Sequence, residues 1–317
     1  MHPAFSVIMF TTLSGAGYGS LALLGVFGLF NWLPADPSFG LCATTVSLVM
    51  ISAGLVSSTS HLGQPRRAWR ALSQWRSSWL SREGVFAVLT YLPTSIFWIT
   101  FLMPEQLHQT KPIINILTVL FPIITIYCTA KIYSSLKTIR QWNHQLVVPA
   151  YLLIGLFGGA IILIFLLSIF GIFFPILGYF VILSGFITGI LKITYWKSID
   201  NANEGSTPES AIGLGGAGKK VSLLDAPTTS ENFVMREMGF KIARKHSTRL
   251  RLTAMFTLFI APSVITLITT LNENSTSIVV LSLVAVIFMC LGSVIERWLF
   301  FAEAKHVVTL YYGATRA

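Results

Sequence analysis

Two long runs without a charged residue are joined by a short segment that begins Ser60-His61-Leu62-Gly63-Gln64-Pro65-Arg66-Arg67-Ala68-Trp69 and continues to Glu83. This segment contains five arginines and three tryptophans, and it is bounded by a histidine and a glutamate, His61 and Glu83. Tryptophan favours the boundary between a bilayer and water. A titratable pair at that boundary suits a protein that moves protons, electrons or both. The segment therefore predicts that the flanking runs cross a membrane.

The composition supports this prediction. The chain has 317 residues, of which 54% are hydrophobic and 11% are charged, and its mean hydropathy is +0.72. A soluble domain has about 25% charged residues, so this protein has too few to cover its surface against water. An apolar run of about 18 or more residues is long enough to span a bilayer, and several such runs are present. We therefore expect a polytopic membrane protein.

The runs predict eight transmembrane helices. The uncharged stretch 148–191 is too long for one span and long enough for two, with a turn near 171–175. We therefore expect an all-α protein, with residues 1–317 forming a single bundle of eight helices. The predicted spans are 5–30, 40–60, 84–103, a run ending near 132, two within 148–191, 252–272 and 277–301.

The basic residues predict the orientation. When the connections are assigned alternately to the two faces, the face with both termini has 21 of the 22 Lys and Arg residues, and the opposite face has only Lys111. The positive-inside rule then places both termini, His61 and the arginine-rich segment in the cytoplasm. The net charge of +10 is explained by topology, and we expect no nucleic-acid partner.

One long polar connection, about 197–251, precedes the seventh predicted span. Its first half is rich in Gly, Ser, Ala and Pro and is typical of a linker. Its second half starts with Thr228-Thr229-Ser230-Glu231, a spacing that can cap a helix, and continues with a basic amphipathic pattern. Such a helix could bind anionic lipid or a soluble partner, and the sequence does not favour either.

The cysteines and histidines limit the cofactors. Cys42, Cys128 and Cys290 lie far apart within apolar runs, so we expect no iron–sulfur cluster and no metal site in this protein. None of the six histidines falls near the middle of a run, so we expect no haem, although a pair such as His61 and His306 at the membrane edge is not excluded.

The candidate site also has simpler explanations. His61 could be an interfacial histidine bonded to a backbone carbonyl, and Glu83 could be a carboxylate at the positive end of a helix. Glu296 and Arg297 could neutralise each other near the end of the last span.

Several motifs resemble those of a known family, the membrane anchor subunits of DMSO reductase type molybdenum enzymes (the DmsC family). The most specific is the His-Leu-Gly-x-Pro block with the later Ser-x-Glu, and the similarity covers nearly the whole sequence. The motifs are His2-Pro3-Ala4-Phe5-Ser6-Val7-Ile8, Thr11-Thr12-Leu13-Ser14-Gly15-Ala16-Gly17, His61-Leu62-Gly63-x-Pro65-x-Arg67-Ala68, Leu80-Ser81-x-Glu83 and Arg297-Trp298-Leu299-Phe300-Phe301.

The resemblance implies a three-subunit complex in the bacterial inner membrane. One partner would carry a molybdopterin cofactor and another four iron–sulfur clusters, while this protein would anchor both and exchange electrons with menaquinone or ubiquinone. The family's quinol-site histidine and carboxylate fall on His61 and Glu83. Further candidates for quinone contact are Arg67 and Arg297, and candidates for partner docking are Arg66, Arg70, Arg76 and Arg82.

The resemblance leaves the reaction of the complex open, and whether the anchor is itself an enzyme is equally open. A connection containing Glu231-Asn232-Phe233-x-x-Arg236-Glu237-Met238-Gly239-Phe240 is similar to cytoplasm-facing, sulfite-oxidising members, so sulfite oxidation is favoured. The alternative is the reduction of DMSO or another S- or N-oxide in anaerobic respiration. Functions of another class are a transporter, which the charge-free span centres disfavour, and a purely structural tether.

Overall fold

The computed structural model describes residues 4–60, 62–201, 205–214, 218, 220–225, 227–228, 230, 232, 234–235 and 246–317. These residues form an all-α fold, as the apolar runs predict. Its helices are α1 (Phe5–Leu29), α2 (Pro37–Thr59), the 3₁₀ helix η1 (Pro65–Gln74), α3 (Trp79–Leu102), α4 (Lys111–Ser134), α5 (Val147–Ile169), α6 (Pro175–Asp200), α7 (Pro208–Ala211), α10 (Ser247–Ala254), the π-helix η2 (Met255–Ile260), α11 (Ala261–Thr270), α12 (Ser275–Ala302) and the 3₁₀ helix η3 (Val307–Leu310).

Eight helices in the described residues are long and apolar enough to cross a bilayer, which confirms the prediction of eight spans. The seventh span is one continuous helix, Ser247–Thr270, made of α10, η2 and α11. Its π-helical turn ends just before Pro262, which has no backbone N–H to donate within the helix.

Short capping residues fix where the helices begin. The Asp36 side chain accepts a hydrogen bond from the Ser38 backbone N–H (2.8 Å) at the start of α2. Ser78 caps α3, so this helix begins at Trp79 rather than at Gly84. As a consequence, Glu83 lies within the first turns of a membrane-spanning helix instead of in the connection before it.

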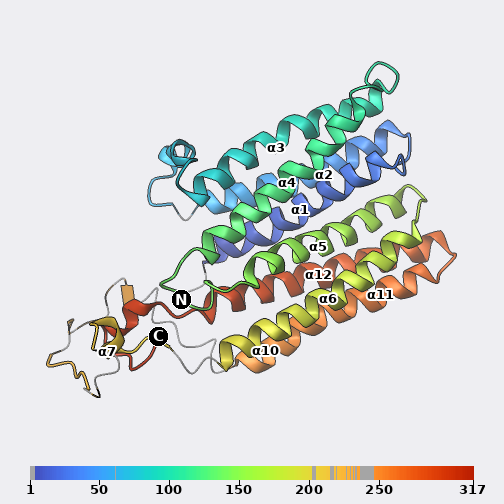
Figure 1. Cartoon of the computed structure of the whole chain (residues 1–317). Helices are drawn as coiled ribbons and strands as arrows, with labels where there is room; N and C mark the ends of the chain where they lie inside the picture. The colour runs from blue at the N-terminus through green and yellow to red at the C-terminus, as the bar shows by residue number, and fades with distance from the viewer. Residues whose placement is uncertain are drawn as a thin grey trace.

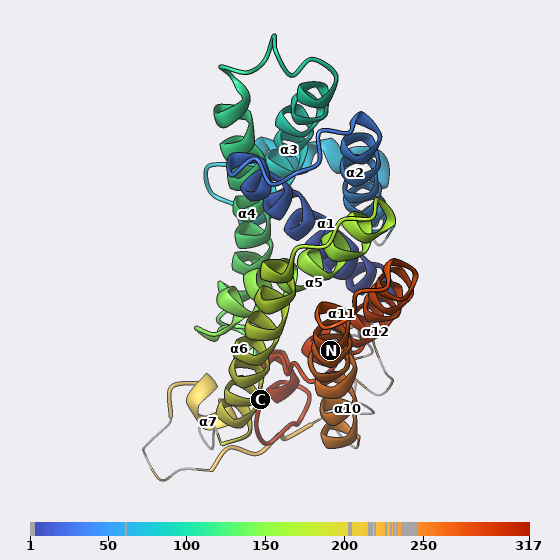
Figure 2. The same cartoon turned by 90° about the vertical axis from the view of Figure 1, so that its right-hand side faces the viewer.

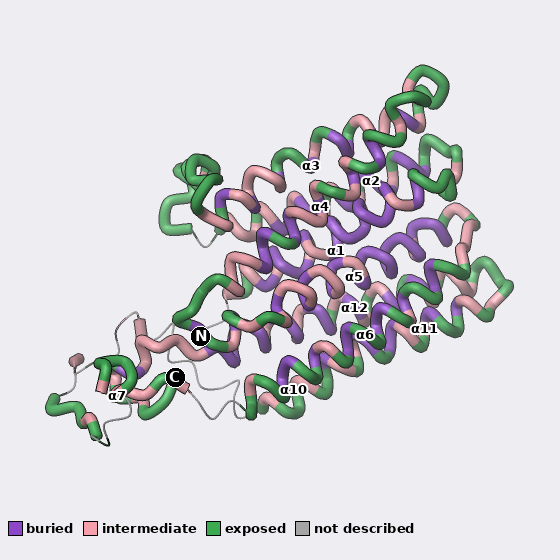
Figure 3. The backbone as a smooth tube through the Cα atoms, in the orientation of Figure 1, coloured by how far each residue is buried: buried purple, intermediate pink, exposed green. Residues whose placement is uncertain are grey.

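The bundle is organised around α1, which packs against α2, α4, α5 and α12. In Figure 1, α1–α4 form one half, and α5, α6, α10–α11 and α12 form the other, with α1 and α5 side by side at the junction. Figure 2 shows the two halves from a perpendicular direction. Buried residues are concentrated along α1 and α5 in Figure 3, while the outer faces of the other helices are exposed where the bilayer would lie.

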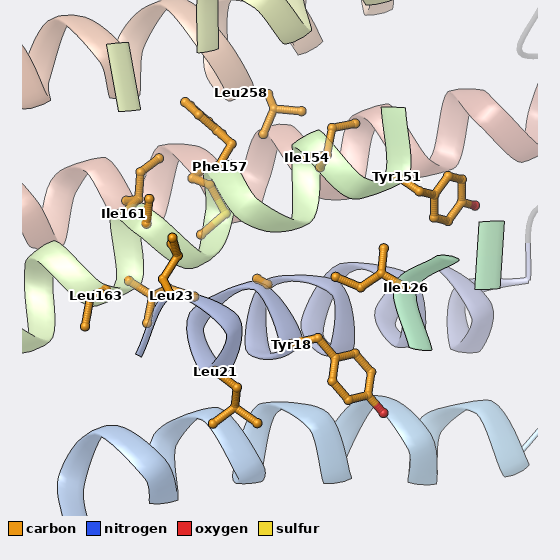
Figure 4. Close-up of a cluster of buried hydrophobic side chains, with 14 of the residues drawn as sticks. Tyr18, Leu21, Leu23, Ile126, Tyr151, Ile154, Phe157, Ile161, Leu163 and Leu258 are labelled. Atoms are coloured by element: carbon orange, nitrogen blue, oxygen red, sulfur yellow. The ribbon is translucent and has the colours of Figure 1, made fainter. Parts of the chain in front are cut away.

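Glycines let α1 and α5 approach closely. A Cβ added at Gly19 would overlap the backbone oxygen of Gly155, and one added at Gly159 would overlap the backbone of Gly19. Small residues at such crossings bring helix backbones together in membranes, where lipid provides no hydrophobic drive for association. The surrounding apolar side chains, among them Leu21, Phe157 and Ile161, form the core in Figure 4.

Both ends of the protein lie at one end of the bundle, together with η1 (Figure 1). We call this the terminal end. An aromatic cluster joins the two halves there, because Tyr133 packs against Trp142, Tyr151 and Phe300, and the Trp142 indole N–H donates to the Phe300 carbonyl oxygen (2.9 Å).

The predicted amphipathic helix is not tested by the structure. Residues 236–245, which contain most of its basic positions, lie outside the described residues. The described part of this connection includes α7, and the backbone is helical again from Ser247, the first residue of α10.

Candidate functional site

Glu83 is buried at the terminal end of α3, with 5% of its surface exposed. Thr129 on α4 donates its hydroxyl hydrogen to the Glu83 carboxylate, and Tyr18 on α1 lies within electrostatic range of it. From the sequence, Glu83 was expected at the membrane edge, in contact with water. The carboxylate is buried instead. His61 lies outside the described residues, so the structure does not place it relative to Glu83.

The connection between α2 and α3 folds over the start of α3 on both sides of Glu83. Ser81 donates its hydroxyl hydrogen to the Ala71 carbonyl oxygen, and a Cβ added at Gly84 would lie 2.8 Å from the Leu72 side chain. These contacts hold η1 directly above the first turns of α3. The arginine-rich segment and the Glu83 carboxylate consequently belong to one structural unit.

The arginines of this segment have two different roles. Arg66, Arg67, Arg70 and Arg76 are exposed, as are Trp69 and Trp75, whose side chains are 66% and 53% exposed. This surface is cationic and aromatic, and it is available to a partner or to lipid headgroups.

Arg82, in contrast, stabilises the segment itself. It donates to the carbonyl oxygens of Trp75 (3.0 Å) and Arg76 (2.7 Å), and its guanidinium lies over the Trp79 ring, 4.3 Å from the centroid. Of the four predicted docking arginines, Arg82 therefore has its hydrogen-bonding groups engaged within the protein.

A cavity with a mixed polar and apolar lining lies between α1, α4, α5 and α12, and Thr129 is part of that lining. Eight of its fourteen lining residues carry a hydroxyl or a guanidinium group, which is unusual for the centre of an apolar bundle. Tyr18, Tyr151, Ile126 and Ile154 of this lining are drawn in Figure 4, where Tyr18 extends from α1 toward α2. The threonine that holds Glu83 thus connects it to an internal polar space.

The cavity is too narrow for a quinone ring. The volume open to the centre of a water molecule is ≈ 20 Å³. Pockets for drug-sized organic ligands enclose roughly 300–1,000 Å³, whereas one water needs about 10–15 Å³ of space for its centre. The cavity can therefore hold water but not a quinone ring.

Arg297 lines the same cavity from α12 and is 2% exposed. Its guanidinium lies over the Tyr151 ring, 3.8 Å from the centroid, and its Nε is 3.0 Å from Glu296 Oε2. The other carboxylate oxygen, Glu296 Oε1, is 2.6 Å from Lys192 Nζ. Glu296 and Arg297 do neutralise each other, as one explanation of the sequence predicted, but a second buried cation joins them.

Lys192 is the residue that sequence reasoning missed. It immediately follows the uncharged stretch 148–191, so the apolar pattern leaves it outside the two spans predicted there, yet α6 extends to Asp200 and buries its side chain. Glu296 inside the last span was the available signal, because a buried carboxylate requires a cationic partner.

A second group of charges continues from this cluster to the surface. Arg251 pairs with Glu303 (Nε to Oε1, 2.8 Å) and with Asp200 (Nη1 to Oδ2, 2.5 Å). The Asp200 side chain is 56% exposed, whereas Glu303 is 8% exposed. Burial raises the pKa of Glu303 above its ordinary value, although the Arg251 guanidinium opposes the shift.

Two histidines near the terminal end act as backbone caps. Nδ1 of His306 accepts a hydrogen bond from the Val308 N–H (3.0 Å), and Nδ1 of His144 accepts one from the Leu146 N–H (3.2 Å). Burial lowers the pKa of both imidazoles, and Arg140 adds to the effect at His144. The neutral ring is the form that can accept these bonds.

No group of three His, Cys, Asp or Glu side chains that could hold a metal ion occurs among the residues that the structure describes. The expectation that this protein itself holds no haem, metal or iron–sulfur cluster stays an expectation.

The family model that matches the chain is that of the DMSO reductase anchor subunit (DmsC), over residues 1–313. The chain belongs to the DmsC family. This identifies it as a membrane anchor subunit and agrees with the eight spans and with the motifs around residues 61–83.

Two kinds of curated relative are similar to this DmsC-family protein. The C subunit of the sulfite dehydrogenase of Allochromatium vinosum is 31% identical over 335 aligned residues, which cover 98% of the present sequence and 99% of that relative. The C component of the anaerobic dimethyl sulfoxide reductase of Escherichia coli is 23% identical over 52% of the present sequence and 58% of that relative. The corresponding C component from Haemophilus influenzae is 25% identical over 36% of the present sequence and 40% of that relative. The DmsC anchor is thus similar to subunits of both a sulfite dehydrogenase and S-oxide reductases.

Proposed function

We propose that this DmsC-family anchor is the quinone-reactive subunit of a molybdopterin and iron–sulfur oxidoreductase complex, with Glu83 and His61 at the quinone site. The observation that carries the proposal is the Glu83 carboxylate itself. It is buried in a membrane-spanning helix, held by Thr129, and covered by a connection rich in arginine and tryptophan. An ionisable group in such a place is costly and is usually retained for function.

In the proposed reaction, the quinone takes two electrons from the docked partner and two protons from the protein, and it leaves as quinol. His61 donates a hydrogen bond to one quinone oxygen, and Glu83 transfers both protons to the substrate in turn, being reprotonated between the two transfers. Because the cavity beyond Thr129 has room only for water, the ring binds beside Glu83 but outside that cavity. Thr129 orients the carboxylate for this transfer.

The exposed face of η1 is the proposed docking surface for the four-cluster iron–sulfur subunit. Arg66, Arg70 and Arg76 project a cationic surface beside two exposed tryptophans, and such a combination binds an acidic partner and speeds its association. The same surface brings the partner's nearest cluster above Glu83. Arg67 lies on this exposed face, whereas Arg297 reaches the site only through the cavity and contributes positive charge from within.

We further propose that the terminal end faces the cytoplasm of a bacterial inner membrane, and that the complex oxidises sulfite and passes the electrons to menaquinone or ubiquinone. The uneven distribution of Lys and Arg supports the orientation. The match to the sulfite dehydrogenase relative over 98% of the sequence supports the substrate, since the S-oxide reductase relatives match only about half of the sequence or less.

A structural tether would need no buried carboxylate, and a transporter would bind its substrate near the centre of the membrane.

The proposal is tested by comparing two electron acceptors in membranes that contain the whole complex. The His61→Ala variant should lose quinone-linked turnover by about 10²-fold or more while keeping assembly and turnover with an artificial dye. Undiminished quinone turnover in His61→Ala would show that the site is elsewhere.

A further inference from the structure

We propose that the cavity between α1, α4, α5 and α12 is a hydrated proton passage that joins Glu83 to the buried cluster Lys192–Glu296–Arg297 and, through that cluster, to water at the terminal end of the bundle. The inference rests on the proposed function, because it identifies the source of the protons that quinone reduction consumes at Glu83.

One hydroxyl group indicates that the cavity contains water. Thr12 is 7% exposed and lines the cavity, and its Oγ1 has no hydrogen-bond partner among the described residues. A buried hydroxyl without a partner is unfavourable, and ordered water is its usual partner where the site is polar and large enough. The ≈ 20 Å³ open to water centres meets that condition.

Glu83 is connected to one end of this water. Thr129 lines the cavity and donates its hydroxyl hydrogen to the carboxylate, so a water molecule that donates to the Thr129 hydroxyl is two hydrogen bonds from Glu83. Series of carboxylates, hydroxyls and water are the arrangement that carries protons inside membrane proteins.

The buried charge cluster forms the other end. Arg297 lines the cavity, and Glu296 beside it lies between two cations, 3.0 Å from Arg297 Nε and 2.6 Å from Lys192 Nζ. The Glu296 carboxylate can accept a proton, and the flanking cations keep it available as an anion. Lys192 Nζ and the Arg251 guanidinium both lie over the Trp196 ring, 4.9 Å and 5.5 Å from its centroid, so the cluster adjoins the Arg251 ion pairs.

From Glu303 the route continues to the surface along two carboxylates that Arg251 holds close together. Arg251 bridges Glu303 and Asp200, and the exposed Asp200 side chain meets water at the terminal end of α6. Protons would therefore enter on the side of the membrane where the iron–sulfur partner docks. Since the electrons arrive from the same side, quinone reduction would move no net charge across the bilayer.

Gly15 offers a direct way to block the passage. It lines the cavity, and a Cβ added there meets no atom within 4 Å, so a side chain at this position begins in open space and extends into the cavity. The Gly15→Val variant removes the space for water with an apolar group. The Gly15→Ser variant is the matched control, because its smaller side chain adds a hydroxyl that can join the hydrogen-bonded path.

Both variants are to be measured in the whole purified complex, with turnover by quinone and by an artificial dye, and with binding of a short-tailed quinone analogue. We expect Gly15→Val to slow quinone-linked turnover by about tenfold or more. Dye turnover and analogue binding should be retained, and Gly15→Ser should stay close to the unmodified complex. Unchanged quinone turnover in Gly15→Val would overturn the passage. Loss of analogue binding would overturn the passage as well, since it would show that the quinone ring binds in the cavity.

A second measurement does not depend on turnover. A high-resolution map of the complex should show water in the cavity within hydrogen-bond distance of Thr12 Oγ1, and an empty cavity would contradict the proposal. The failures are distinguishable. If His61→Ala keeps quinone turnover, the quinone site is wrong, whereas if His61→Ala loses it and Gly15→Val keeps it, only the passage is wrong.

Discussion

Thr129 on α4 donates its hydroxyl hydrogen to the carboxylate of Glu83 on α3, so a threonine on one membrane helix determines where a carboxylate on the next helix lies. The bond explains how the anchor keeps an acidic group inside an apolar bundle. It also joins the proposed quinone site to the cavity, because Thr129 belongs to both.

Replacing Thr129 with valine should impair both stability and quinone chemistry. The valine side chain has the same shape but donates no hydrogen bond, and leaving the Glu83 carboxylate without this bond should cost about 1–3 kcal/mol of unfolding free energy. Quinone-linked turnover should fall while dye turnover persists. The Thr129→Ser variant keeps the donor and should recover most of both properties. If valine and serine behaved alike in a turnover assay, the hydroxyl would have no role.

The buried cluster of two cations and one carboxylate predicts an asymmetric response to mutation. Glu296→Gln leaves Lys192 and Arg297 as neighbouring buried cations and should destabilise the protein by about 3–5 kcal/mol. Lys192→Met leaves a matched pair of Glu296 and Arg297 and should cost clearly less. Thermal unfolding of the detergent-solubilised complex measures both. Equal losses, or a larger one for Lys192→Met, would contradict this account of the cluster.

Two glycines four positions apart on α1 should differ sharply. Gly19→Ala places a methyl group against the Gly155 backbone and should destabilise the bundle by at least about 1–3 kcal/mol. Gly15→Ala extends into the cavity and should be neutral or stabilising by up to about 1 kcal/mol, because alanine favours helix. The amount of assembled complex in membranes reports the difference. Similar yields would mean that α1 and α5 do not cross at Gly19.

Sequence reasoning recovered the number of spans because each span is a long apolar run. Such a run can be recognised from its own hydropathy, without knowing which helices pack against it. It missed the first turn of α3, since Ser78 caps a helix whose first five residues include Arg82 and Glu83, and the apolar pattern places such charged residues in the connection. It also missed Lys192 and the cavity. Both depend on which helix faces of distant segments meet, and hydropathy along one segment does not contain that information. The predicted pair of Glu83 with His61 stays a prediction, because His61 lies outside the described residues.

Stability should fall on acidification through the histidine caps. Burial lowers the pKa of His306, so the folded state favours the neutral ring. Stability from this cap is present above the ordinary pKa of about 6.5 and is lost as the pH falls through the lower folded-state pKa. His306→Asn keeps an acceptor for the Val308 N–H without titrating. Its melting temperature should therefore fall less than that of the unmodified protein between about pH 7 and pH 5. If the melting temperature of His306→Asn depended on pH as that of the unmodified protein does, His306 would not cause the loss of stability, and His144 would be the remaining histidine cap to test.

The central claim is that Glu83 transfers protons to a quinone, and the Glu83→Gln variant tests it most directly, because glutamine preserves the shape and the ability to accept a hydrogen bond from Thr129. The measurement is the ratio of quinone-linked to dye-linked turnover in membranes containing the intact complex. We predict that the ratio falls by about 10²-fold or more, with dye turnover and subunit assembly unchanged. A ratio equal to that of the unmodified complex would contradict the claim and leave the buried carboxylate with a structural role alone.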